Sequence, residues 1–167
     1  SGIHHHETWF AEKNSSFKLR NADSLTFLKT GFSKIDFTFP SIENKKVSLS
    51  DEKYKNKVTV LQIMGSWCPN CMDETMFLSE LYNKYNSQGL EVAALAFEKA
   101  EAFEKASHNV SRMKNKYNAK YEFLITGFQP KDADKALPML NHVMSFPTTI
   151  FIDRKGNVRK IRTGYSG

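Results

Sequence analysis

Cys68 and Cys71 are the only two cysteines in this chain of 167 residues, and two residues separate them. They follow an apolar run at 58–64 and stand at the start of an amphipathic stretch at 69–87. At a helix start this spacing brings both sulfur atoms within reach of a disulfide. The free N–H groups and partial positive charge there stabilise a thiolate, so we expect the pKa of Cys68 to fall below about 8.5.

The thiolate is the nucleophile of disulfide exchange, so the motif predicts redox chemistry. Cys68 is predicted to be the exposed attacking residue at the end of the helix. Cys71 lies one turn further in, and we expect it to be more buried and to resolve the mixed disulfide. The alternatives are a passive structural pair or half of a zinc site, for which His108 and His142 are the nearby candidate ligands.

A strand, a helix and a second strand must hold this motif in place. Residues 58–64 and 90–97 are short apolar runs typical of buried strands, and residues 69–87 repeat apolar side chains at steps of three and four. Two such strands joined by a helix predict a parallel, right-handed βαβ unit. The remaining expected elements are a hairpin within 37–49, a helix at 100–117, a strand at 121–125, a short helix at 132–137, and paired strands at 148–153 and 158–163.

Composition places the chain among single globular domains, and the order of the expected strands and helices assigns it to the α/β class. It is 40% hydrophobic and contains 13 Phe against 8 Gly and 5 Pro, which argues against a disordered or fibrous chain. The net charge of +6 is too small to indicate nucleic acid, and we expect no such partner. No apolar run approaches the roughly 20 residues of a membrane span, so we expect any membrane tether to lie outside this chain.

Several motifs in order resemble the thioredoxin superfamily. These are Trp67-Cys68-Pro69-Asn70-Cys71 after one buried strand and Phe146-Pro147-Thr148-Thr149 before another. Over about residues 36–166 the chain is similar to the TlpA/ResA-like thiol–disulfide oxidoreductases of bacterial cell envelopes, which are related to the AhpC/TSA and redoxin proteins. The resemblance implies a thioredoxin-like fold, with a central mixed sheet flanked by helices, an N-terminal β-hairpin, and an αβ insertion before the cis-proline strand.

The resemblance also implies roles for residues around the motif. Pro147 matches the family's cis-proline. The alternative interpretation of this residue is an ordinary trans proline in an edge strand. Phe146 and Pro147, together with Trp67, Pro69 and Asn70, would form the substrate-binding rim.

Glu74 is a third candidate catalytic residue beside the two cysteines. It follows Cys71 by three residues and so shares its helix face, where burial would raise the pKa of the carboxyl group. The family has a glutamate here that is considered important in thiol proton transfer; the alternative is a glutamate simply favoured by the helix dipole. Gln62 stands where thioredoxins proper have a buried aspartate, so proton transfer would rest on Glu74 or water.

The expected domain organisation is an N-terminal extension at 1–30, which could be the remnant of a preceding region, and a thioredoxin-like domain at 31–167. The family's C-terminal helix is missing after the last strand, so either it was removed or residues 1–30 cover that face of the sheet. Three consecutive histidines, His4 to His6, cannot all face one ion in a regular structure, and we expect no metal site there.

The sequence therefore predicts a thiol–disulfide oxidoreductase, most simply a periplasmic reductase of disulfides in cell-envelope proteins, with apocytochrome c maturation as one role. We expect a monomer with no organic cofactor and no metal, a disulfide-containing protein substrate and an upstream thiol electron donor. One alternative is the opposite redox direction. Another is a Sco-like copper-binding module on the same fold, although such modules carry Cys-x-x-x-Cys.

Overall fold

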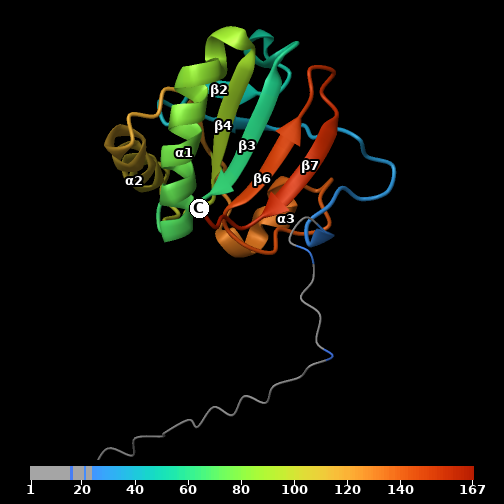
Figure 1. The fold of residues 1–167 in the computed structure, drawn as a ribbon. Coiled ribbons are helices and arrows are strands. Elements are labelled where there is room, and N and C mark those ends of the chain that lie inside the picture. Colours follow the sequence, from blue (N-terminus) through green and yellow to red (C-terminus); the bar gives the residue numbers. More distant parts are fainter. Residues whose placement is uncertain (1–15, 17–20, 22–23) are drawn as a thin grey trace, which may run out of the picture.

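The computed structural model describes residues 16, 21 and 24–167 of the chain. A five-stranded mixed sheet forms its centre (Figure 1). Its strands run in the order β5 (Glu122–Ile125), β4 (Leu90–Ala96), β3 (Val58–Met64), β6 (Thr148–Ile152) and β7 (Val158–Thr163). β3 pairs in parallel with β4, and β4 with β5, whereas β6 is antiparallel to both β3 and β7. The predicted parallel βαβ unit and the predicted final hairpin are both confirmed.

The predicted N-terminal hairpin is also present. It consists of β1 (Thr38–Pro40) and β2 (Lys46–Ser48), which pair in antiparallel fashion as a separate two-stranded sheet. The residues of its turn reach the outer strand of the main sheet, because the Ile42 N–H donates to the Phe123 carbonyl at 3.1 Å. The hairpin thus covers the β5 edge, which would otherwise expose unpaired backbone groups.

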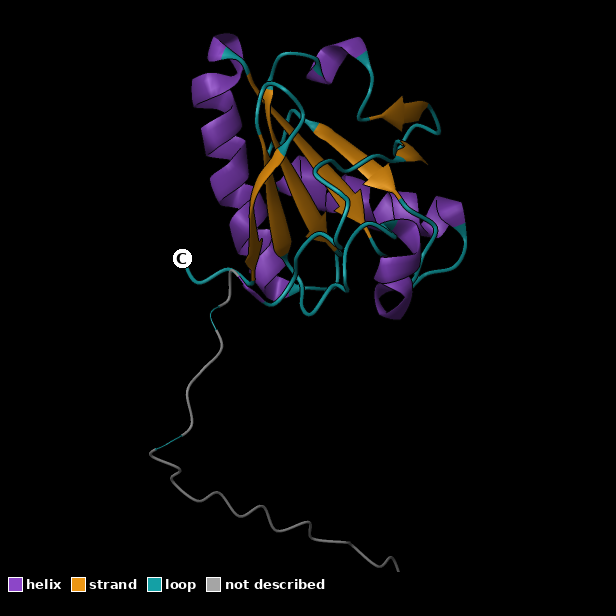
Figure 2. Ribbon diagram, turned by 90° about the vertical axis from the view of Figure 1, so that its right-hand side faces the viewer, coloured by secondary structure: helices purple, strands orange, loops and turns teal. Residues whose placement is uncertain are grey.

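Helices lie on both sides of the sheet (Figure 2). On one side α1 (Pro69–Tyr85) and α2 (Phe103–Lys116) bury their apolar faces, through Leu78, Val110 and Met113, against β3, β4 and β5. α3 (Ala133–Ala136) packs on the other side, where Leu61 and Ile150 belong to the core. The 3₁₀ turns are η2 (Glu52–Tyr54), η3 (Asn86–Gln88) and η4 (Pro130–Asp132).

The expected insertion between β4 and β6 consists of α2, β5, η4 and α3. α1 ends at Tyr85, two residues before the predicted end, because η3 tightens the last turn before Gly89, whose φ of 99° requires a glycine. None of the described helices is long and apolar enough to cross a bilayer.

Most of the extension predicted at 1–30, including His4 to His6, lies outside the described residues. The continuous described part of it, residues 24–30, joins the α3 side of the molecule. There Leu28 bridges to Leu140, and the Lys29 N–H donates to the Met139 carbonyl at 2.8 Å. This stretch therefore contributes to the core opposite α1.

We predict that Leu61→Ala destabilises the fold strongly. Leu61 is fully buried in β3, and removing such a side chain costs about 2–5 kcal/mol because a cavity remains. Val58→Ala at the start of the same strand is the matched control, since Val58 is 38% exposed and its loss should change stability by only about 0.5 kcal/mol. Urea unfolding with reduced thiols measures both values, and equal losses would contradict this assignment of the core.

Candidate active site

Cys68 caps the first turn of α1, at the end of the sheet where β3 ends. The Cys71 N–H donates to the Cys68 sulfur at 3.3 Å, so the sulfur takes the place of an N-cap acceptor. Pro69 occupies the first turn, where its missing N–H removes no helix hydrogen bond. Both cysteines are free thiols. The helix start predicted from the sequence therefore holds a sulfur atom in the position where a thiolate is stabilised.

The expected exposure of Cys68 is wrong. Cys68 is only 5% exposed and Cys71 is fully buried, so their order agrees with the prediction but the first sulfur is also covered. Trp67 and Phe146 pack against the same apolar cluster, and the Cys68 thiol donates to the Phe146 carbonyl at 3.5 Å. The position of Cys68 at a helix end does not show which aromatic rings from elsewhere in the chain pack beside it. In the folded protein these rings reduce the exposure of the Cys68 sulfur.

Burial keeps the Cys71 thiol protonated. Desolvation is the largest cause that raises the pKa of Cys71 far above its ordinary value, and a hydrogen bond with the Cys68 side chain raises it further. The charge of the Glu74 carboxylate acts in the same direction. Attack by Cys71 on another sulfur therefore needs a group that accepts its proton.

Glu74 lies on the buried face of α1, as predicted. It is 4% exposed, and desolvation raises the pKa of its carboxyl group above the ordinary value of 4.5. The hydroxyl of Thr149 donates to one carboxylate oxygen and the amide of Gln62 donates to the other at 3.0 Å. Both hydrogen bonds lower the pKa, but the effect of burial is larger.

Gln62 connects this carboxyl group to the cysteine backbone. Its amide nitrogen also donates to the Cys71 carbonyl at 3.3 Å, and its oxygen accepts a hydrogen bond from Thr75 at 3.2 Å. Sequence reasoning identified Gln62 only as a replacement for an aspartate and missed Thr149 and Thr75. The pairing of Gln62 with Thr149 across β3 and β6 brings these side chains together, and no local sequence pattern shows that register.

The predicted rim residues surround Cys68 in different ways. The Phe146–Pro147 peptide bond is cis, as the resemblance implied, and Pro147 itself is buried. The rings of Trp67 and Phe146 lie 5.3 Å apart between centroids, whereas Pro69 and Asn70 are exposed beside them. The structure thus gathers all five residues around Cys68; their role in substrate binding stays a prediction.

The loop before Cys68 is held by the end of β4, which sequence reasoning did not single out. The buried carboxylate of Glu98 accepts hydrogen bonds from the N–H and the hydroxyl of Ser66, both at 2.7 Å. The Trp67 indole donates to the Phe97 carbonyl at 2.9 Å. Gly65 leaves room for the indole, since a Cβ atom there would lie 2.2 Å from the ring nitrogen.

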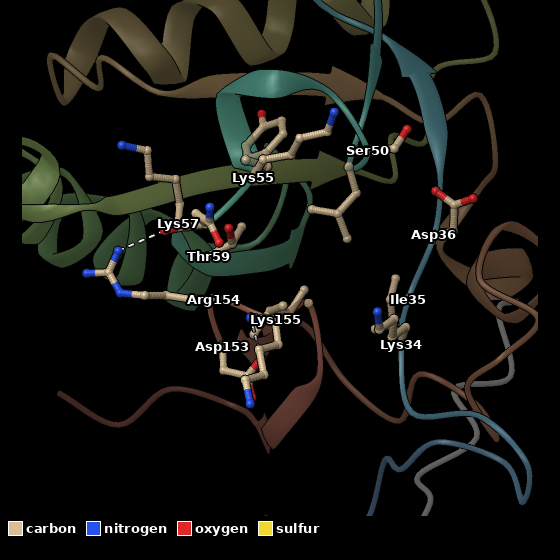
Figure 3. A pocket seen from close by; sticks show the side chains of 15 residues that line it. Lys34, Ile35, Asp36, Ser50, Lys55, Lys57, Thr59, Asp153, Arg154 and Lys155 are labelled. Atoms are coloured by element: carbon tan, nitrogen blue, oxygen red, sulfur yellow. Dashed lines mark hydrogen bonds between the residues drawn. The ribbon is translucent and has the colours of Figure 1, made fainter.

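A cavity of about 650 Å³ lies away from this site. It lies at the opposite end of the sheet, near Thr59 in the first part of β3 and Arg154 after β6 (Figure 3). Arg154 is committed there to backbone carbonyls, donating to Asn56 at 2.8 Å and to Gln88 at 3.2 Å. Within the described part of the chain, no group of three or more His, Cys, Asp or Glu side chains could hold a metal ion.

Comparisons with known proteins agree with this geometry. A family model described as Redoxin matches residues 31–167. The thiol-disulfide oxidoreductase ResA of Geobacillus thermodenitrificans is 29% identical over 141 residues, which cover 83% of this chain and 72% of the relative. ResA of Bacillus anthracis is 30% identical over 125 residues, covering 74% of this chain and 63% of the relative. The chain therefore spans about two thirds of the length of these relatives.

Solved structures share the fold. A putative thiol:disulfide interchange protein DsbE from Chlorobium tepidum superposes with a TM-score of 0.66 at 21% identity, covering 84% of this chain and 89% of that one. A thiol-disulfide oxidoreductase from Bacteroides fragilis gives a TM-score of 0.65 at 16% identity, covering 81% and 92%. At these identities the likeness shows a thioredoxin-like fold alone.

We predict a pH-dependent stability difference between the wild type and Glu74→Gln. Because the pKa of Glu74 is raised in the folded state, its contribution to stability is complete below the ordinary value of 4.5 and is lost as pH rises through the folded value. The amide does not titrate. The wild type should therefore lose stability relative to Glu74→Gln between pH 4 and neutral pH.

Urea unfolding at several pH values, with the thiols reduced, measures this difference. Glu80→Gln is the matched control, because Glu80 lies on the exposed face of the same helix. A difference between wild type and Glu74→Gln that stays constant over this range would show that Glu74 does not titrate as its burial requires.

Proposed function

The chain belongs to the Redoxin family and is a thiol–disulfide oxidoreductase, and from this premise we propose that it reduces disulfides in cell-envelope proteins. The direction is supported by the resemblance to the TlpA/ResA-like reductants, with which the ResA relatives agree. The observation that carries the exchange chemistry is the Cys68 sulfur at the start of α1, where it accepts a hydrogen bond from the Cys71 N–H at 3.3 Å. A strong oxidant of this kind owes its potential to a stabilised reduced form, so the reduction potential distinguishes the two directions.

The proposed cycle begins with the Cys68 thiolate. It attacks one sulfur of the substrate disulfide, that S–S bond breaks, and a mixed disulfide forms while the leaving substrate thiolate takes up a proton. Cys71 then loses its proton and attacks the Cys68 sulfur, which releases the second substrate thiol. Two electrons pass from the cysteine pair to the substrate, and a Cys68–Cys71 disulfide remains for an upstream thiol donor to reduce. Since the pair carries both electrons, the cycle uses no organic cofactor and no metal.

We assign the proton transfer from Cys71 to Glu74. The raised pKa of Glu74 makes its carboxylate a better base than an exposed one, and the Cys71 thiol cannot ionise readily without such a partner. Gln62 keeps the two groups in register, because its amide bonds both the Cys71 carbonyl and a Glu74 oxygen. Gln62 itself is neutral and takes no proton, so it acts as a positioning residue.

The site of action and the partners belong to the same proposal. Thiol–disulfide exchange in general requires a disulfide substrate and a thiol partner. We infer a periplasmic location in the bacterial cell envelope, a monomeric state, and a membrane tether, if any, outside this chain. One solved relative is described as a secreted disulfide oxidoreductase of Mycobacterium tuberculosis, which supports an extracytoplasmic setting. The resemblance to TlpA/ResA-like proteins favours apocytochrome c as one substrate.

The reduction potential of the Cys68–Cys71 couple tests the direction. We expect a value near or below about −230 mV in equilibrium with a dithiothreitol series, as for thioredoxin-like reductants. Cys71→Ser is the control and should show no two-electron couple. A potential near about −120 mV would make the protein an oxidant of substrate thiols and overturn the proposed direction.

Glu74→Gln should slow the resolving step selectively. Stopped-flow mixing of the reduced protein with a peptide disulfide separates mixed-disulfide formation from release of the second thiol. Loss of a positioned base typically costs about 100-fold, so we expect that loss in the second step and little change in the first. Glu80→Gln provides the control for an exposed charge on the same helix. Unchanged resolution in Glu74→Gln would remove Glu74 from the proton-transfer role.

A further inference from the structure

A groove of about 510 Å³ opens beside the redox motif, between the start of α1 and the C-terminal half of α2. Trp67 and Met72 form its near end. Trp67 precedes Cys68 in the chain, and Met72 follows it by one helical turn, so both flank the attacking sulfur. The groove therefore begins at residues on either side of Cys68 in the sequence. The groove is lined by Ser66, Trp67, Met72, Asn109, Arg112, Met113, Lys116 and Tyr117.

The floor of the groove is apolar and adaptable. Met113 is buried, and Met72, Trp67 and Tyr117 are half-buried. Methionine side chains are flexible and polarisable, and they accept apolar groups of different shapes. Such a floor suits the varied side chains that flank a cysteine in a protein substrate.

The rim of the groove is cationic. Arg112 and Lys116 are exposed and stand four residues apart, on successive turns of one face of α2. The ammonium group of Lys99, which does not itself line the groove, lies 4.8 Å from the centroid of the Trp67 ring. No Asp or Glu is among the described residues that line the groove, and the ion pairs found in the described part of the chain involve none of these three cations.

A second hollow, next to Glu98, differs in charge. It is lined by Glu98, Glu101 and Asp132 and by one lysine, Lys131. Because the groove is lined by Arg112 and Lys116 and by no carboxylate, whereas the second hollow is lined by three acidic residues, an acidic segment would be attracted to the groove.

We propose that this groove binds the substrate segment next to the reacting cysteine and selects acidic side chains there. The inference rests on the proposed reductase function and names its substrate class: disulfides flanked by Asp or Glu, together with an apolar residue. The apolar residue packs on the methionine floor, and the carboxylate pairs with Arg112 and Lys116. This preference depends on the residues beside the reacting cysteine and not on which envelope protein carries the disulfide.

Three synthetic peptides test the proposal. They share one Cys-x-x-Cys disulfide and differ only in flanking residues, which are two Asp, two Gln or two Lys. Single-turnover mixing with pre-reduced protein gives a second-order rate constant for each peptide. At low salt we expect the Asp peptide to react about fivefold faster than the Lys peptide, and the ratio to shrink at 0.5 M salt because exposed charges are screened.

Variants separate the groove from the overall charge of the protein. Arg112→Gln with Lys116→Gln should bring the Asp-to-Lys ratio close to one, and Arg112→Glu with Lys116→Glu should invert it. The charge-matched control is Lys120→Gln with Lys155→Gln, which removes the same two charges at exposed positions outside the groove and should keep the ratio. Far-UV circular dichroism establishes that each variant is folded.

The outcomes distinguish the two proposals. If the reduced wild type reacts with none of the peptides, the proposed function fails. If it reduces all three at equal rates, or if the control lowers the ratio as much as the groove variant, the groove inference alone is overturned. Sedimentation of the wild type and the groove variant completes the test, because a dimer lost on substitution would place a second copy of this chain in the groove.

Discussion

The burial of one carboxyl group connects the chemistry of this site to the architecture of the sheet. Glu74 is on a helix, but its two hydrogen-bond donors, Gln62 and Thr149, are on β3 and β6. An ionised carboxylate without donors would be very costly at this depth. The antiparallel register that places Gln62 opposite Thr149 is therefore also the register that allows an acid to lie under Cys71. A shift of β6 by one residue would turn Thr149 to the other face of the sheet and leave Gln62 as the only one of the two donors beside Glu74.

The position of Cys68 depends on a different strand. β4 ends at Ala96, and the next two residues hold the loop before the motif through Ser66 and Trp67. The shape of this loop is set by these contacts, by the packing of the Trp67 ring and by the space that Gly65 leaves for that ring. The loop before the attacking cysteine is thus held by the end of β4, whereas the backbone of the resolving cysteine is held by Gln62 of β3. Thiol–disulfide exchange requires both cysteines to be in place. The polar groups around them are accordingly buried and hydrogen-bonded.

The sequence predicted those features that local patterns encode. Strand β3, helix α1 and the hairpin β1–β2 follow from apolar periodicity, and the cis peptide before Pro147 followed from family motifs. The cover over Cys68 was not predictable in this way, because Phe146 is 78 residues away and its position depends on the completed sheet. The same holds for Glu98 with Ser66, 32 residues apart, and for Thr149 with Glu74, 75 residues apart. Composition and spacing identify the reacting atoms, whereas long-range pairing decides how exposed and how acidic they are.

The insertion between β4 and β6 adds a feature that the core chemistry does not need. Its helix α2 supplies the cationic rim of the groove, while Glu74, Gln62 and Thr149 all belong to the framework outside it. Arg112 and Lys116 are exposed, so their side chains can change without disturbing the packing of Met113 beneath them. Substrate selection and proton transfer are then located on different elements, and a change in α2 can alter which disulfides are recognised while the reacting dithiol stays the same.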